Sequence, residues 1–333
     1  MNPLTFATIV PYMQKTKVNK RRYWLKWIGW VVVAQIILVN ISASIYAYRF
    51  THFYDAPPGL HSAQNIFHKT WKLFTGPKFY KNTKEPEPSF PFENITLTTS
   101  DSISIDGWYS AVDSSKGCVI FFHGLTVNKS FLEPEAAQFR QWGYNVLLLD
   151  LRAHGKSGGN TSSIGMKETE EVKLAFDYAE QRGNKKIILY GVSLGASICL
   201  KAVADANVQP AGIIADVPFR SLHDHFKSRA KMVGFPSEPF ATLVTMWIGI
   251  RSGYNPFRHN MVSYAKKVGC PVLVEWGMND PLVKESEVKS IYSNLSSKNK
   301  KLVIYPDASH GAFLRDEAKT WTNETQAFLN SLQ

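Results

Sequence analysis

The stretch that most constrains the fold is residues 186–206, where an apolar segment, a serine between two glycines and a helical pattern follow one another. Residues 186–190 have the composition of a buried strand, and 194–206 predict a helix. Between them stands Gly191-Val192-Ser193-Leu194-Gly195. The pattern also arises by chance in loops, but here a strand precedes it and a helix follows. It therefore predicts a sharp turn that holds Ser193 in strained geometry at the end of a sheet.

Short strand candidates alternate with helical patterns from residue 93 to the C-terminus. Besides an antiparallel pair, 95–99 and 103–111, the strand candidates are 118–122, 145–150, 186–190, 212–216, 272–276 and 302–305. The helical patterns are 131–142, 164–182, 194–206, 285–295 and 312–332. Right-handed crossovers between such strands produce a mainly parallel sheet with helices on both faces. The sequence predicts an α/β fold of this kind over residues 93–333.

This alternation lapses between residues 218 and 270. Two helices, 219–233 and 240–250, are predicted there, and we expect a short helical cap over about 219–270. The apolar side chains of the insertion either line a pocket for an apolar substrate group or form the insertion's own core, and the usual placement of apolar residues favours the core. They are Phe235, Phe240, Leu243, Met246 and Trp247.

An apolar segment near the N-terminus is long enough to cross a bilayer. Residues 27–48 contain no Asp, Glu, Lys or Arg, whereas residues 1–26 contain six Lys or Arg and no acid. The positive-inside rule then leaves the N-terminus in the cytoplasm. We expect a basic cytoplasmic N-terminus (1–26), a transmembrane helix (27–48) and a linker (49–92), with domain 93–333 on the extracytoplasmic side as part of a single-pass membrane protein.

Two alternatives remain for this segment. A cleaved signal peptide needs two small residues in an A-x-A pattern before the cleavage site. Ala43 and Ala47 do not complete this pattern, because Ile41 and Ile45 stand two places before them. A buried core helix does not explain the charge asymmetry.

Composition excludes several other classes of function. The net charge is +11, of which +6 lies in residues 1–26 and the rest is spread out, so no nucleic-acid-binding stripe is visible. The histidines and the three cysteines lack zinc-site spacing. Glycines 155, 158 and 159 do not form a phosphate-binding fingerprint. We expect no cofactor and no metal.

A serine needs a base to act as a nucleophile, and the base needs an orienting acid. His310 follows the strand candidate 302–305, and Asp280 follows 272–276, so both belong to the sheet edge that should carry Ser193. Each residue also has a purely structural interpretation: His310 as a helix cap and Asp280 as a turn residue. Asp216 is the rival acid, and Asp307 is interpreted as a loop-shaping residue.

Backbone amides are the expected stabilisers of an oxyanion. We expect two N–H groups to bind this oxyanion together: that of Leu125, in the turn after strand 118–122, and that of Leu194, at the start of the helix. We interpret His123 as a brace for that turn. In the loop 150–157, Asp150 and Arg152 are expected to act as braces and His154 to be structural.

Five motifs recur in order over residues 93–333, and together they resemble an α/β-hydrolase-fold serine hydrolase, similar to the membrane-anchored Bem46-like and serine aminopeptidase S33-like branch. They are His123-Gly124, Asp150-x-Arg152-x-x-Gly155-x-Ser157, Gly191-x-Ser193-x-Gly195, Gly277-x-x-Asp280-x-x-Val283 and His310-Gly311. The resemblance implies hydrolysis of an ester, thioester or amide without a cofactor, and it selects no substrate.

The resulting hypothesis is a membrane-anchored serine hydrolase that cleaves carboxylic esters, of small molecules or acyl lipids, through an acyl-enzyme on a Ser193–His310–Asp280 triad. A peptidase, an aminopeptidase or a thioesterase on the same triad is the alternative. A non-catalytic binding protein is a third reading, against which the complete triad argues.

Overall fold

The computed structural model describes residues 20–55, 66–311 and 313–332, so most of the basic N-terminus and part of the expected linker lie outside it. The chain divides into two compact units, residues 1–41 and 42–333. Helix α1 (Lys20–Thr51) passes from the first unit into the second. By length and composition, α1 could cross a membrane. In the first unit its large side chains are exposed, Trp24 by 66% and Trp30 by 71%.

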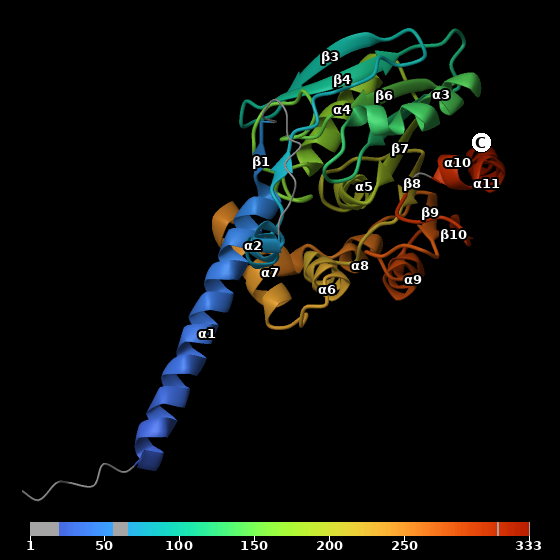
Figure 1. Cartoon of the computed structure of the whole chain (residues 1–333). Helices are drawn as coiled ribbons and strands as arrows, with labels where there is room; N and C mark the ends of the chain where they lie inside the picture. Colours follow the sequence, from blue (N-terminus) through green and yellow to red (C-terminus); the bar gives the residue numbers. More distant parts are fainter. Residues whose placement is uncertain (1–19, 56–65, 312, 333) are drawn as a thin grey trace, which may run out of the picture. The chain divides into compact units, whose positions relative to one another are not determined.

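An eight-stranded sheet forms the centre of the second unit, in the order β10-β9-β8-β7-β5-β6-β4-β3 (Figure 1). Its strands are β3 (Glu93–Thr98), β4 (Ser104–Ser110), β5 (Cys118–Phe122), β6 (Asn145–Leu149), β7 (Ile187–Val192), β8 (Gly212–Asp216), β9 (Val272–Gly277) and β10 (Lys300–Tyr305). All neighbours from β6 to β10 pair in parallel, and only β4 pairs antiparallel to both β3 and β6. The predicted fold class is confirmed.

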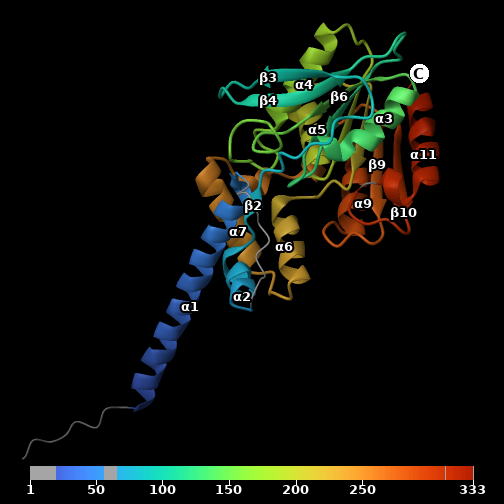
Figure 2. The ribbon, with the colours of Figure 1, turned by 45° about the horizontal axis from the view of Figure 1, so that its top comes forward.

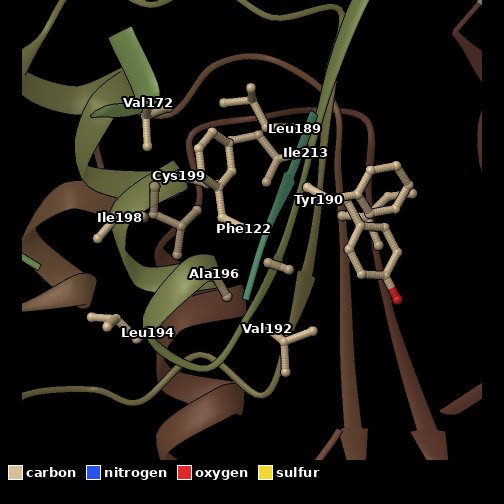
Figure 3. Packing of buried hydrophobic residues seen from close by; sticks show 14 of the residues in the cluster. Phe122, Val172, Leu189, Tyr190, Val192, Leu194, Ala196, Ile198, Cys199 and Ile213 are labelled. Carbon is tan, nitrogen blue, oxygen red and sulfur yellow. The ribbon is translucent and has the colours of Figure 1, made fainter. Parts of the chain in front are cut away.

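Helices cover both faces of the sheet. They are α3 (Glu133–Gln141), α4 (Thr169–Gln181), α5 (Leu194–Asp205), α8 (Met261–Ala265), α9 (Glu285–Asn294), α10 (Phe313–Asp316) and α11 (Ala318–Ser331), with 3₁₀ turns η1 (Lys129–Leu132) and η2 (Pro256–Arg258). Helix α5 packs on β7 and contacts α4 and α8, while α3 meets α11 through Phe139 and Trp321. In Figure 3, Ile198 and Cys199 of α5 lie on the opposite side of the sheet from Tyr190. Apolar side chains packed on both faces of the sheet therefore hold the C-terminal end of β7 in place.

Residues 42–54 pack onto the rest of the second unit instead of standing apart from it. Phe50 and Phe53 are fully buried. The Phe53 N–H donates to Asn160 O at 2.8 Å, and the Ser162 N–H donates to Thr51 O at 2.9 Å. The stretch interpreted from the sequence as a linker contains β1 (Phe53–Tyr54), α2 (Ile66–Thr75) and β2 (Phe79–Tyr80), and β1 pairs with β2.

Two helices, α6 (Leu222–Met232) and α7 (Phe240–Ser252), occupy the region expected to form the cap. Phe240, Leu243 and Trp247 are partly buried and pack against the main core, as the core alternative expects. Phe235 differs, because it lies between the helices and is 47% exposed.

Candidate active site

Ser193 sits in a tight turn between β7 and α5. Its φ is +54°, a value that costs energy for a side chain with a Cβ and that the surrounding contacts must hold in place. The Ser193 N–H donates to Asp216 O at 2.8 Å. A Cβ on Gly195 would lie 1.9 Å from Phe122 O, so only glycine allows α5 to approach β5 this closely. Ser193 is 8% exposed.

His310 and Asp280 lie together in the loops after β10 and β9. His310 Nδ1 is 2.7 Å from Asp280 Oδ2. The other carboxylate oxygen of Asp280 accepts from the Leu282 and Val283 N–H groups at 2.7 and 2.9 Å. The Asp280 side chain is fully buried and that of His310 is 23% exposed. The carboxylate is therefore held rigidly, with one oxygen left for the imidazole.

The loop that carries His310 runs beside the Ser193 turn. A Cβ on Gly311 would lie only 2.9 Å from Cγ1 of Val192, the residue before Ser193. No hydrogen bond between Ser193 Oγ and His310 occurs within the described ranges. Hydrogen bonds between catalytic groups are often long without substrate and shorten in the complex.

The two other acids considered from the sequence have different partners. The Asp216 carboxylate is buried and accepts from Tyr190 OH at 2.6 Å. The Asp307 N–H donates to Glu317 Oε1 at 3.0 Å. Of the acids proposed to orient His310, Asp280 is thus the one placed next to it.

The residues expected to bind an oxyanion lie in the loop 123–129 after β5, called the β5 loop, and at the start of α5. A Cβ on Gly124 would lie 3.7 Å from Ser193 Cβ, so the β5 loop passes beside the serine. The Leu125 and Leu194 N–H groups have no acceptor in the part of the chain that the structure describes. Two unpaired amides, one of them at the start of a helix, suit an anionic oxygen.

His123 braces the β5 loop from within. Its Nδ1–H donates to Gly124 O at 2.7 Å, and its Nε2 accepts from the Leu151 N–H at 3.0 Å. Complete burial lowers the pKa of His123 to about 4 and that of His154 to about 3, because an imidazolium loses hydration there. Both imidazoles are neutral at pH 7, as structural residues would be.

A buried lysine holds the β5 loop at its far end. Lys129 Nζ is 2.7 Å from each of three carboxylates, those of Glu85, Asp106 and Asp150. Asn128 Nδ2 donates to the carbonyls of Asn82 and Lys84 at 2.8 and 3.1 Å, so residues 82–85 support the loop.

These three carboxylates are close enough together to hold a metal ion, but the Lys129 ammonium lies among them. Sequence reasoning recognised Asp150 as a brace and missed Lys129, because lysine is rarely buried. The sequence feature that could have drawn attention to Lys129 is its position just after the turn proposed to bind the oxyanion.

A second group of buried acids consists of Asp216 on β8, Glu275 on β9 and Glu135 on α3, the helix between β5 and β6. Asp216 and Glu275 are neighbours in the β8–β9 register, and Tyr305 OH donates to Glu275. Burial raises the pKa of Asp216 and of Glu275, and it raises the pKa of Glu135 to about 7. Sequence reasoning named only Asp216 of these.

The family comparisons agree with this geometry. Residues 113–255 match the model of the serine aminopeptidase S33 family, and residues 248–330 match that of the dienelactone hydrolase family. The esterase Pf2001 of Pyrococcus furiosus has a similar structure, with 26% sequence identity, a TM-score of 0.62 and coverage of 75% of this chain and 98% of that one. The chain has the α/β-hydrolase fold.

Three further proteins are similar to this chain in sequence. The uncharacterized protein YqkD of Bacillus subtilis is 26% identical over 72% of this chain and 79% of its own length. The uncharacterized membrane protein YNL320W of Saccharomyces cerevisiae is 25% identical over 66% and 74%. The lysophosphatidylserine lipase ABHD12 of Macaca fascicularis is 24% identical over 56% of this chain and 47% of its own length.

Proposed function

We propose that this hydrolase cleaves carboxylic esters through an acyl-enzyme on Ser193, with His310 as the base and Asp280 as its orienting partner. The observation that carries the proposal is the 2.7 Å contact between His310 Nδ1 and Asp280 Oδ2, in a loop that passes beside the Ser193 turn. The contact leaves His310 Nε2 free for the serine hydroxyl.

Each step assigns a task to a named group. His310 Nε2 takes the Ser193 proton while Oγ bonds to the ester carbonyl carbon, and the carbonyl oxygen becomes an oxyanion beside the Leu125 and Leu194 N–H groups. The imidazolium, stabilised by Asp280, returns its proton to the departing alkoxide as the C–O bond breaks. Water then attacks the acyl-enzyme carbonyl carbon and gives a proton to His310. His310 passes that proton to Ser193 Oγ as the bond between Oγ and the acyl carbon breaks, which releases the carboxylic acid and restores free Ser193.

We further propose that α1 anchors the domain in a membrane, with the N-terminus cytoplasmic and domain 93–333, including its cap at about 219–270, on the other side. Of the expected span 27–48, residues 42–48 belong to the second unit and Ala43 and Ala47 are buried there, so the part of α1 before Ser42 is the part proposed to lie in the lipid. The length and apolar composition of α1 support the anchor, and the basic residues before it support the orientation. An enzyme tethered in this way meets acyl lipids, and lysophosphatidylserine lipase ABHD12 among its relatives is named for such a substrate.

Amide hydrolysis is the second candidate, because residues 113–255 match the serine aminopeptidase model. An aminopeptidase needs an anionic group to bind the free amino terminus. The two acids at the ends of β8 and β9, Asp216 and Asp280, are engaged by Tyr190 and His310. This engagement favours an ester substrate.

Covalent labelling tests the nucleophile. The full-length protein should react with a fluorophosphonate probe, and Ser193→Ala should abolish the reaction, whereas Ser197→Ala, one turn further along α5, should keep it. Labelling that survives in Ser193→Ala contradicts the proposal. Turnover of short p-nitrophenyl esters, compared with matched thioesters and aminoacyl amides, then separates the esterase from its alternatives.

A further inference from the structure

One surface of the domain combines exposed apolar side chains with uncompensated positive charge. It is made by the end of α2 and by the α6–α7 connection, and we call it the α2–α6 surface. A groove of about 430 Å³ crosses it, with Leu73 and Pro77 on one side and Met232 and Val233 on the other. Exposed fractions are 46% for Leu73, 55% for Met232 and 56% for Val233. Contiguous apolar exposure of this kind marks an interaction site.

The α2–α6 surface lies beside the place where the chain leaves the domain (Figure 2). Ser42, the first residue of the domain, donates a hydrogen bond to Phe74 O at the end of α2. One turn later, Tyr46 lines the groove and meets the ring of Phe240 at a centroid distance of 5.3 Å. Ile41, the last residue of the first unit, is bonded directly to Ser42. Whatever surrounds the end of the apolar segment therefore reaches this surface too.

The charge of the α2–α6 surface favours an anionic partner. Helix α2 carries Lys72, and residues 225–237 carry Lys227, Arg229 and Lys231; neither stretch has an Asp or Glu, and Glu238, which follows the second one, pairs with Lys227. Lys72 and Lys231 are exposed, and neither makes an ion pair within the described ranges. Exposed lysines next to apolar side chains suit a membrane surface with anionic headgroups.

We propose that the α2–α6 surface docks on an anionic lipid leaflet, with Met232 and Val233 inserted below the headgroups and the lysines at phosphate level. This inference rests on the proposed anchoring by α1 and adds to it. The anchor alone does not decide which face of the domain meets the lipid, whereas a docked surface holds α6 and α7 against it. An ester carried by a membrane lipid would then reach the cap without crossing bulk water.

The test places an environment-sensitive NBD label at one cysteine at a time in the full-length protein. Of the three native thiols, Cys118 and Cys199 are buried and Cys270 is half-buried, so Cys270→Ser gives the background. The labelled variants are Val233→Cys on the surface, Val33→Cys within the apolar part of α1, and Lys319→Cys on α11, which Figures 1 and 2 place away from α2 and α6. Each is reconstituted in equimolar phosphatidylcholine and phosphatidylglycerol vesicles containing a doxyl-labelled lipid as quencher.

We expect the doxyl lipid to quench the labels at 33 and 233 and to leave the label at 319 unchanged. Quenching at 33 without quenching at 233 overturns the docking and leaves the anchor standing. Failure at both positions overturns the anchor and the docking together. Equal quenching at 233 and 319 also overturns the docking, since contact is then not specific to this surface. A blue-shifted but unquenched label at 233 indicates a second copy of the chain as the partner and contradicts a lipid partner.

In vesicles of phosphatidylcholine alone, quenching at 233 should weaken, whereas that at 33 should persist; undiminished quenching at 233 overturns the assignment to anionic lipid.

Discussion

The two sides of strand β7 bury their acids in different ways. On the β5–β6 side, the carboxylates of Asp106 and Asp150 each lie 2.7 Å from the Lys129 ammonium. On the β8–β9 side, no ion pair within the described ranges involves Asp216 or Glu275, and burial raises the pKa of both. The first side therefore depends on one cation, whereas the second depends on bound protons. Ser193 lies between them, so substitutions on the two sides should act on different properties.

Asp280 is the exception on the β8–β9 side, because it faces an imidazole, and its replacement should have the largest effect. Asp280→Asn keeps the oxygen that accepts from the Leu282 and Val283 N–H groups but loses the charge opposite His310. We expect esterase kcat to fall by up to about 10⁴-fold, as for the equivalent change in a protease triad, with little change in stability. Asp307→Asn is the matched control and should retain nearly full activity. A fall of less than tenfold in Asp280→Asn would remove this acid from the triad.

Lys129→Met should instead act mainly on stability. It removes the cation from the buried carboxylates of Glu85 and Asp150 and from the partly buried Asp106, and breaking a buried pair costs about 3–5 kcal/mol. Thermal unfolding of the detergent-solubilised protein measures the loss. The control is Lys156→Met, since Lys156 also contacts Glu85, at 3.1 Å, but its side chain is 54% exposed, and this change should cost about 1 kcal/mol or less. Equal losses for the two variants would contradict the contrast between the two sides.

A third buried acid, Glu135 on α3, makes no ion pair within the described residues and should make stability depend on pH. Because the folded-state pKa of Glu135 is about 7 and its ordinary value is 4.5, the folded protein binds this proton more tightly than the unfolded chain does. The resulting stabilisation is complete below about pH 4.5 and is lost as the pH rises through 7. The unfolding temperature should therefore fall between pH 5 and pH 8.

The matched substitution is Glu135→Gln, which stays neutral at every pH and should flatten that slope by about 1–3 kcal/mol over the interval. Glu180→Gln, on the exposed face of α4, should leave the slope as it is. An unchanged slope in Glu135→Gln would show that this acid does not hold its proton in the folded state.

The parts of this picture that depend on local pattern could be predicted from the sequence. The strand, the glycine-flanked turn at Ser193 and the following helix are contiguous, and the alternation of strands and helices indicated the sheet. The charge pairing around Lys129 could not be predicted, because Glu85 is 44 residues away in the chain and the two meet only in the fold. The docking of Phe50 and Phe53 was missed for a related reason. A segment rich in aromatics and prolines has the composition of a linker, and its burial depends on a surface supplied by distant residues.

The central claim is that Ser193 carries the acyl group between two chemical steps. Rapid-quench reaction of the full-length protein with p-nitrophenyl acetate, followed by peptide mapping by mass spectrometry, tests it directly. The account predicts a burst of p-nitrophenol matched by acetyl on the peptide that contains Ser193, absent in His310→Ala. Steady ester turnover with no acetyl on Ser193, or with acetyl on another side chain, would contradict it.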